Sequence, residues 1–114
     1  MFKKICILGC GLIGSSILRA INKNKLSKEN SVFDKSKKVL DFVKKEKLSS
    51  EVTNDIQLAV KNADLVIIST PLSSYAELIS LIKNDLKAGV ILTDTGSVKK
   101  EINKVIENSK LKNT

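Results

Sequence analysis

Apolar residues along this chain fall into two alternating patterns. The first is a short, continuous run of apolar residues, which is typical of a strand buried on both faces of a parallel sheet. Residues 5–8 and 63–69 are the clearest examples, and Pro71 stops the second one. These runs predict buried strands at residues 3–9, 31–34, 63–69 and 90–94, with a weak edge strand at residues 51–53.

The second pattern repeats apolar residues every three or four positions, as in an amphipathic helix. It predicts helices at residues 15–24, from Ser36 onward, from residue 54 or 55 to 60, at 73–85 and from 98 to about 110. Residues 22–30 are polar and lysine-rich, which indicates the end of the first helix and a loop. On the second helix we expect one apolar side made of Val39, Leu40, Phe42 and Val43.

Strands and helices thus alternate from end to end, which predicts an α/β fold with a parallel sheet and helices on both faces. The first loop is glycine-rich, so the Rossmann-type doubly wound sheet is the natural match, with strand order 3-2-1-4-5. The 114 residues contain no repeat or linker, and we expect residues 1–114 to form one dinucleotide-binding domain.

Composition narrows the class of partner. The net charge is +8, but the basic residues are scattered lysines with a single arginine, Arg19, and only 4% of the residues are aromatic. The chain has too few arginines to read bases and too few aromatic residues to stack on them, so we expect no nucleic-acid partner. No apolar run is long enough to span a membrane, which favours a cytoplasmic protein. Cys6 and Cys10 do not have a metal-binding spacing, and the chain has no histidine to complete a site.

The loop after the first predicted strand has the spacing of a dinucleotide-binding turn. Glycines at positions 1, 3 and 6 of this loop allow a tight turn, a close approach of pyrophosphate to the backbone, and close packing of the next helix. Free amides at the helix N-terminus then favour a phosphate. The predicted cofactor-binding residues of the loop are Gly9, Cys10, Gly11, Leu12, Ile13 and Gly14.

Asp34 is the last residue of the second predicted strand, 20 residues after Gly14. A carboxylate at this place can accept the ribose hydroxyls of adenosine and repels a 2′-phosphate, so it favours NAD over NADP. Lys35 follows directly, and it could offset that repulsion together with Lys37 and Lys38. A solvated first turn of helix is the explanation of these lysines that we favour. We therefore predict NAD as the cofactor, with NADP as the alternative.

Polar residues also follow the fourth and fifth predicted strands. Ligands of open α/β sheets bind beyond the carboxyl ends of the strands. We therefore expect Ser69, Thr70 and Pro71 to meet the cofactor, although they also read as a plain strand-ending turn. Asp94 lies on the same predicted rim and is also predicted to bind the cofactor, although local backbone donors could satisfy it equally well. Ser97 is well placed to cap the last helix.

Three segments give the chain a family resemblance. Residues 7–16 (ILGCGLIGSS), 63–71 (ADLVIISTP) and 93–99 (TDTGSVK) resemble the prephenate/arogenate dehydrogenases of tyrosine biosynthesis, the third segment most specifically. The resemblance implies NAD(P)-dependent oxidative decarboxylation of a cyclohexadienyl substrate and a homodimer for the full-length protein. In that family, the serine matched by Ser97 orients a catalytic histidine.

The chain departs from the family in one respect that decides its expected activity. It contains no histidine, and the resemblance covers only the cofactor domain, without the helical catalytic and dimerisation domain. A general base must come from protein, so we expect this chain to bind cofactor without turning over substrate. We also expect an apolar patch where a missing domain would pack, and hence self-association. The alternatives are a stand-alone nucleotide-binding module and the cofactor domain of another Rossmann reductase.

Overall fold

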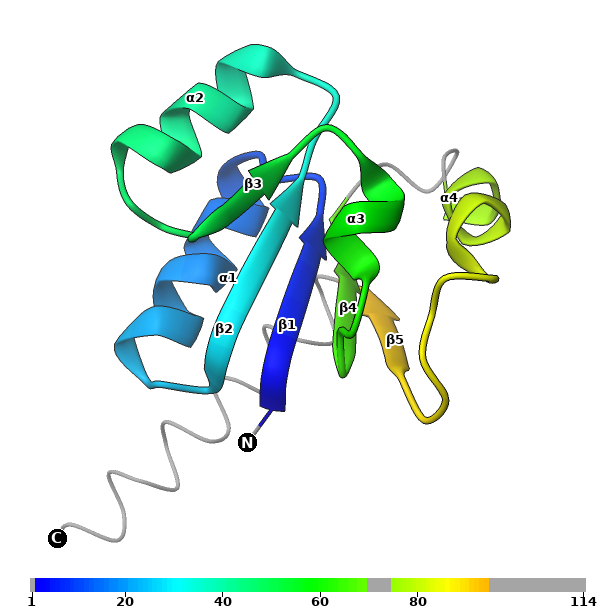
Figure 1. Ribbon diagram of the computed structural model, residues 1–114. Helices are drawn as coiled ribbons and strands as arrows, with labels where there is room; N and C mark the ends of the chain where they lie inside the picture. Colours follow the sequence, from blue (N-terminus) through cyan, green and yellow to red (C-terminus); the bar gives the residue numbers. More distant parts are fainter. Residues whose placement is uncertain (1, 70–74, 95–114) are drawn as a thin grey trace, which may run out of the picture.

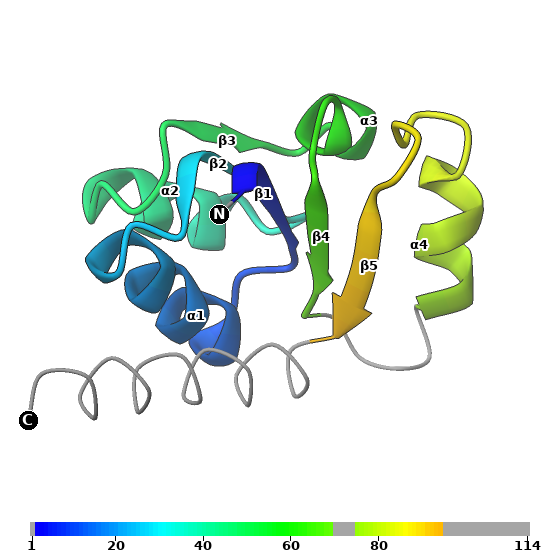
Figure 2. The same cartoon turned by 90° about the horizontal axis from the view of Figure 1, so that it is seen from below.

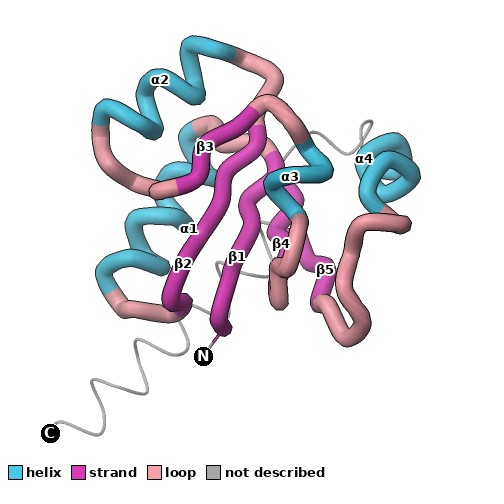
Figure 3. The backbone as a smooth tube through the Cα atoms, in the orientation of Figure 1, coloured by secondary structure: helices cyan, strands magenta, loops and turns pink. Residues whose placement is uncertain are grey.

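The computed structural model describes residues 2–69 and 75–94. Within that part a five-stranded sheet has the order β3-β2-β1-β4-β5, and each pair of neighbours is parallel (Figure 1). The strands are β1 (Phe2–Leu8), β2 (Ser27–Phe33), β3 (Glu51–Thr53), β4 (Leu65–Ile68) and β5 (Ile91–Asp94). The helices between them are α1 (Leu12–Lys23), α2 (Lys37–Lys45), α3 (Ile56–Val60) and α4 (Tyr75–Ile82) (Figure 3). The predicted Rossmann-type fold and its strand order are confirmed.

The helices form two layers, one on each face of the sheet. α1 and α2 cover one face, and α3 and α4 cover the other (Figure 2). Successive strand residues point to opposite faces, so Ile5 and Ile7 pack in the α1–α2 core while Cys6 and Leu8 pack in the α3–α4 core. Both faces are covered where β1 and β4 run side by side, and residues 5–8 and 65–68 are apolar at every position there, which explains these unbroken apolar runs.

The prediction that residues 22–30 form the end of a helix and a loop is wrong for residues 27–30, which belong to β2. β2 starts at Ser27, where it pairs with Phe2, and the pairing continues through Glu29 opposite Lys4. The side chains of Lys28 and Glu29 are exposed at this end, so the strand is held by backbone pairing and carries no apolar signal there. α1 also begins earlier than predicted, at Leu12, so the second half of the glycine loop is already helical.

The expectation that the fifth strand is buried is also wrong. Among the described strands β5 pairs with β4 alone and lies at the edge of the sheet. Its residues are therefore exposed or half-buried, and Ile91 is 52% exposed. The predicted helix at 98–110 lies outside the described residues, as do residues 70–74 before α4. Among the described helices, none combines the length and the apolar character that crossing a bilayer requires.

Candidate functional site

The register of the sheet gathers the predicted site residues at one edge. Leu8 is opposite Phe33 of β2 and Ile68 of β4, and Ile68 is in turn opposite Asp94 of β5. The residues that follow these strands therefore emerge side by side at the carboxyl edge of the sheet. The first residues after β1, β2 and β4 are Gly9, Asp34 and Ser69. Backbone hydrogen bonds tie two of them to the neighbouring strand: Gly9 N–H donates to Phe33 O at 2.7 Å, and Ser69 N–H donates to Leu8 O at 2.9 Å.

Two glycines of the loop are required by the fold itself. Gly9 has φ of 87°, in the left-handed region that favours glycine. Gly14 lies in the first turn of α1, and a Cβ placed on it would be 2.8 Å from the carbonyl oxygen of Gly9 and 3.3 Å from Ser69 Oγ. The predicted roles of these two residues, a tight turn and close helix packing, are confirmed.

Gly11 differs from the other two because the fold does not require a glycine there. Its φ is −80° and its ψ is −154°, an extended conformation that other residues adopt. A Cβ on Gly11 would find no heavy atom of the described chain within 4 Å. The space beside Gly11 is open, as the close approach of a ligand would need.

The N-terminus of α1 also differs from those of α2 and α3. Ser36 caps α2 by accepting a hydrogen bond from Val39 N–H at 3.4 Å, and Asp55 caps α3 by accepting from Gln57 N–H and Leu58 N–H at 3.1 and 3.2 Å. α1 begins on Gly11 with no side-chain cap. A helix leaves its first N–H groups without intrahelical partners, so the start of α1 presents free donors and a positive dipole end beside the open side of Gly11.

Asp34 links the glycine loop to the start of α2. Its Oδ2 accepts a hydrogen bond from Cys10 N–H at 2.9 Å, and its Oδ1 accepts from Ser36 N–H at 2.8 Å. The carboxylate is half-buried, and Lys35 after it is exposed. The structure therefore places Asp34 against the glycine loop, a contact that the sequence did not predict, and the predicted contact with the ribose stays a prediction.

The side chain of Cys10 packs against the start of α1. It is buried, and its Sγ lies 3.5 Å from Ser15 Oγ. Burial raises the pKa of the Cys10 thiol, against a smaller opposing effect of the contact with Ser15. Burial likewise raises the pKa of Cys6 to about 12. Burial thus favours the protonated form of both thiols, which disfavours a role as nucleophile. No group of potential metal ligands occurs among the described residues either.

A groove between α1 and α2 adjoins the loop, and sequence analysis missed it. It has a volume of about 510 Å³ and is lined by Cys10, Gly11, Ser15, Ser16, Arg19, Lys38, Val39 and Phe42. Phe42 was predicted on the buried side of α2, but it is 43% exposed because it lines this groove, whereas Leu40 and Val43 are buried. The i, i+4 spacing of Ser15 with Arg19 and of Lys38 with Phe42 was the available signal that these side chains share helix faces.

The structure describes some of the remaining predicted site residues but not all of them. Ile13, in the first turn of α1, is 57% exposed at the same edge. Asp94 is exposed at the end of β5. Thr70, Pro71 and Ser97 lie outside the described residues.

A diphosphate fits what the described residues offer at this edge. Uncapped helix amides and an open glycine are the two features that bring phosphate oxygens within hydrogen-bonding reach of a backbone.

Comparison with known proteins identifies the family. Residues 17–114 match the family described as the nucleotide-binding domain of prephenate dehydrogenase. The chain belongs to this family. This agrees with the resemblance found in the sequence and makes the chain a nucleotide-binding domain.

Two curated relatives cover nearly all of the domain. Cyclohexadienyl dehydrogenase of Zymomonas mobilis is 39% identical over 109 residues, which are 96% of this chain and 37% of the relative. Prephenate dehydrogenase of Lactococcus lactis is 32% identical over 115 residues, which are 96% of this chain and 32% of the relative. The chain thus spans about a third of the length of these relatives.

Solved structures agree on the fold. Prephenate dehydrogenase from A. aeolicus, in complex with hydroxyphenyl propionate and NAD+, has a TM-score of 0.75 at 18% identity, over 82% of this chain and 33% of that one. Arogenate dehydrogenase from Synechocystis has a TM-score of 0.69 at 20% identity, over 80% of this chain and 32% of that one.

Proposed function

We propose that this domain binds NAD at the carboxyl edge of its sheet, as the cofactor half of a cyclohexadienyl dehydrogenase acting on prephenate or arogenate. The observation that carries the proposal is the pairing of an uncapped α1 with the open side of Gly11. Family membership and the NAD+ complex of the A. aeolicus relative support it.

Each part of the edge has a role in this proposal. The amides of Gly11, Leu12 and Ile13 receive the diphosphate. Asp34, which has lone pairs left after accepting two backbone N–H groups, accepts hydroxyls of the adenosine ribose. Its negative charge disfavours a 2′-phosphate, and therefore NADP. Ile13, Ser69 and Asp94 lie at the same edge and contact the cofactor beyond the diphosphate. Thr70 and Pro71 directly follow Ser69 in the sequence and stay predicted cofactor contacts.

The chemistry of the whole protein divides between the cofactor and residues beyond this domain. The nicotinamide supplies the hydride acceptor for an oxidative decarboxylation. The general base is a histidine, and because this chain contains none, the base comes from elsewhere in the functional protein. Ser97 orients that histidine by hydrogen bonding, as its place in the TDTGSVK segment suggests. We place the functional protein in the cytoplasm, as a homodimer.

Calorimetric titration of the 114-residue chain with NAD and with NADP tests the proposal. We expect one saturable site for NAD. NADP should bind at least about tenfold more weakly, which corresponds to a difference of about 1.4 kcal/mol in binding free energy. Absence of binding by both cofactors at millimolar concentration would contradict cofactor binding, whereas equal affinities would contradict only the NAD preference.

The activity part needs a separate measurement. We expect the isolated chain to give no detectable NADH with prephenate or arogenate. Turnover at an ordinary dehydrogenase rate would show that the chain carries its own base.

A further inference from the structure

Asp34 makes more contacts than a ribose acceptor needs. Its two carboxylate oxygens are each hydrogen-bonded to a backbone N–H, Oδ2 to Cys10 at 2.9 Å and Oδ1 to Ser36 at 2.8 Å. These two donors belong to different segments, the glycine loop after β1 and the first residues before α2. The carboxylate therefore joins two loops that meet at the carboxyl edge.

The amides of the glycine loop divide into two sets. Gly9 N–H donates to Phe33 O and Cys10 N–H donates to Asp34, so both of these donors are committed within the protein. The donors available to a ligand begin at Gly11, at the uncapped start of α1. The hydrogen bond to Asp34 thus fixes the peptide immediately before the first amide that faces the ligand.

The position of Cys10 strengthens this reading. Its side chain is buried, with only 1% of the residue exposed, and it contacts Ser15 on the next turn of α1. The residue is held from both sides, by its thiol against the helix and by its amide against Asp34. A loop held in this way keeps the following amides in place before any ligand arrives, and ligand binding then costs less ordering.

We infer that Asp34 is a positioning residue for the diphosphate cradle: it holds the glycine loop in the conformation that receives phosphate, in addition to any contact with ribose. The inference rests on the proposed cofactor site and deepens it. Charge-assisted hydrogen bonds between a carboxylate and backbone N–H groups are among the stronger ones in proteins, which suits a bracing role.

The negative charge of Asp34 distinguishes a bracing role from a contact with ribose alone. Asp34 is an anion beside an anion-binding loop, so its negative charge alone opposes phosphate binding. If Asp34 acted only on the ribose, neutralising it would leave binding of a ribose-free phosphate unchanged or make it tighter. If Asp34 braces the loop, the same change weakens that binding.

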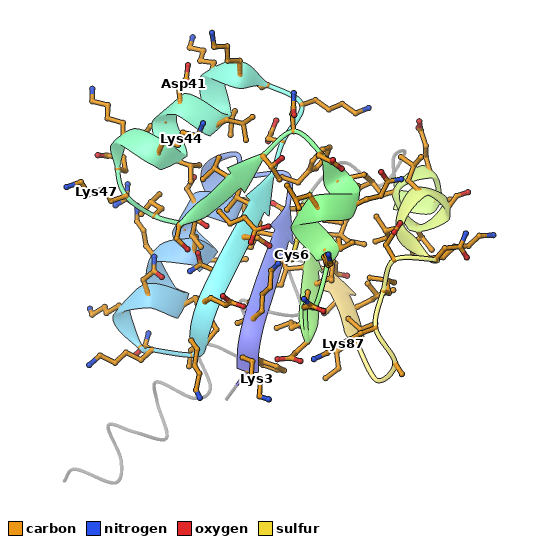
Figure 4. The ribbon with its side chains drawn as sticks, viewed as in Figure 1. Lys3, Cys6, Asp41, Lys44, Lys47 and Lys87 are labelled. Carbon is orange, nitrogen blue, oxygen red and sulfur yellow. The ribbon has the colours of Figure 1, made fainter. Side chains whose placement is uncertain are left out.

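The experiment compares the wild-type chain with Asp34→Asn and Asp34→Ala, using inorganic pyrophosphate and NAD as probes. Asp41→Asn is the matched control, because Asp41 is exposed on α2 and projects away from the sheet (Figure 4). Binding is followed by NMR of the loop amides. Hydrogen exchange of the Cys10 amide in the ligand-free chain reports directly on the brace.

We expect pyrophosphate affinity to fall about fivefold or more in Asp34→Ala, with Asp34→Asn intermediate because its amide oxygen still accepts one of the two bonds. Cys10 amide exchange should rise in both variants and stay unchanged in Asp41→Asn. Unchanged or tighter pyrophosphate binding, or unchanged Cys10 exchange in both variants, would overturn the inference. If the wild-type chain binds neither probe, the proposed function fails, while the exchange measurement still decides whether Asp34 braces the loop.

Discussion

The two edges of the sheet are both rich in polar groups, but they use them differently. At the amino edge, Asp64 accepts hydrogen bonds from Lys3 N–H and Lys4 N–H, at 2.7 and 3.2 Å, and forms an ion pair with Lys87 (Figure 4). At the carboxyl edge, the amides at the start of α1 have no side-chain cap. Asp64 and its partners satisfy one another within the protein, whereas the donors at the start of α1 are left for something else. The amino edge has one exception among the described residues, because the buried Ser27 Oγ has no hydrogen-bond partner.

Lys4 is a buried charge that the amino edge satisfies from within the protein. It is only 5% exposed, yet its Nζ donates to Lys61 O at 2.7 Å and pairs with Glu51 at 3.3 Å. Lys61 follows the last residue of α3. The ammonium group of Lys4 therefore places a positive charge at the C-terminus of that helix. A buried charge with such partners is explained by the fold alone. The contrast teaches that a polar cluster indicates a ligand site when its donors lack partners, rather than when they are numerous.

Gly11→Ala is the strongest test of this contrast. The new methyl group meets no heavy atom of the described chain, so stability should change by less than about 1 kcal/mol, mainly through the loss of a favoured N-cap residue. The same methyl group occupies the space that the diphosphate needs. Because hydrogen bonds to charged groups contribute about 1.5–3 kcal/mol each, we expect NAD affinity to fall about a hundredfold, measured by calorimetry. Unchanged NAD binding would show that the open side of Gly11 serves no ligand.

Gly14→Ala should affect the fold as well as binding. Its Cβ would lie 2.8 Å from the backbone oxygen of Gly9, so α1 must move away from the loop. We expect a loss of about 1–3 kcal/mol in the free energy of unfolding, measured by denaturant titration with circular dichroism. Gly11→Ala is the matched control, since it adds the same methyl group three residues earlier. Equal stability of the two variants would remove the distinction between a structural and a ligand-facing glycine.

Much of this contrast could be read from the sequence, because the relevant signals are local. The unbroken apolar runs of β1 and β4 exist because both faces of these strands are covered, and they fixed the architecture. The positions of Gly9 and Gly14 followed from loop spacing, and Asp34 from its place after β2. Each of these signals depends on residues close together in the chain.

What the sequence did not predict depends on tertiary partners. The first half of β2 is polar and exists because β1 pairs with it, and β5 is exposed because it lies at an edge. Phe42 has the periodicity of a core residue, but its exposure depends on the spacing of α1 and α2. The hydrogen bond from Cys10 N–H to Asp34 joins residues 24 positions apart, and no local pattern of the sequence predicts it.

The smallest effect we expect comes from the amino edge, in Asp64→Asn. The hydrogen bond with Lys87 and those from the Lys3 and Lys4 amides lower the pKa of Asp64 from 3.8 to about 2. A carboxyl group whose folded pKa is depressed stabilises the fold above its unfolded pKa, near 4, and loses this contribution as the pH falls toward 2. The wild-type chain should therefore have a higher Tm than Asp64→Asn at neutral pH, and the difference should shrink progressively below pH 4.

NAD affinity completes the comparison, because Asp64 lies at the opposite edge from the proposed site. We expect the variant to bind NAD as the wild type does at neutral pH, and Asp41→Asn to show neither the Tm difference nor its pH dependence. A Tm difference that stays constant down to pH 2 would mean that Asp64 acts through its shape and not its charge. A loss of NAD affinity would mean that the two edges are coupled through β1 and β4, and the separation of structural from ligand-facing polar groups would then fail.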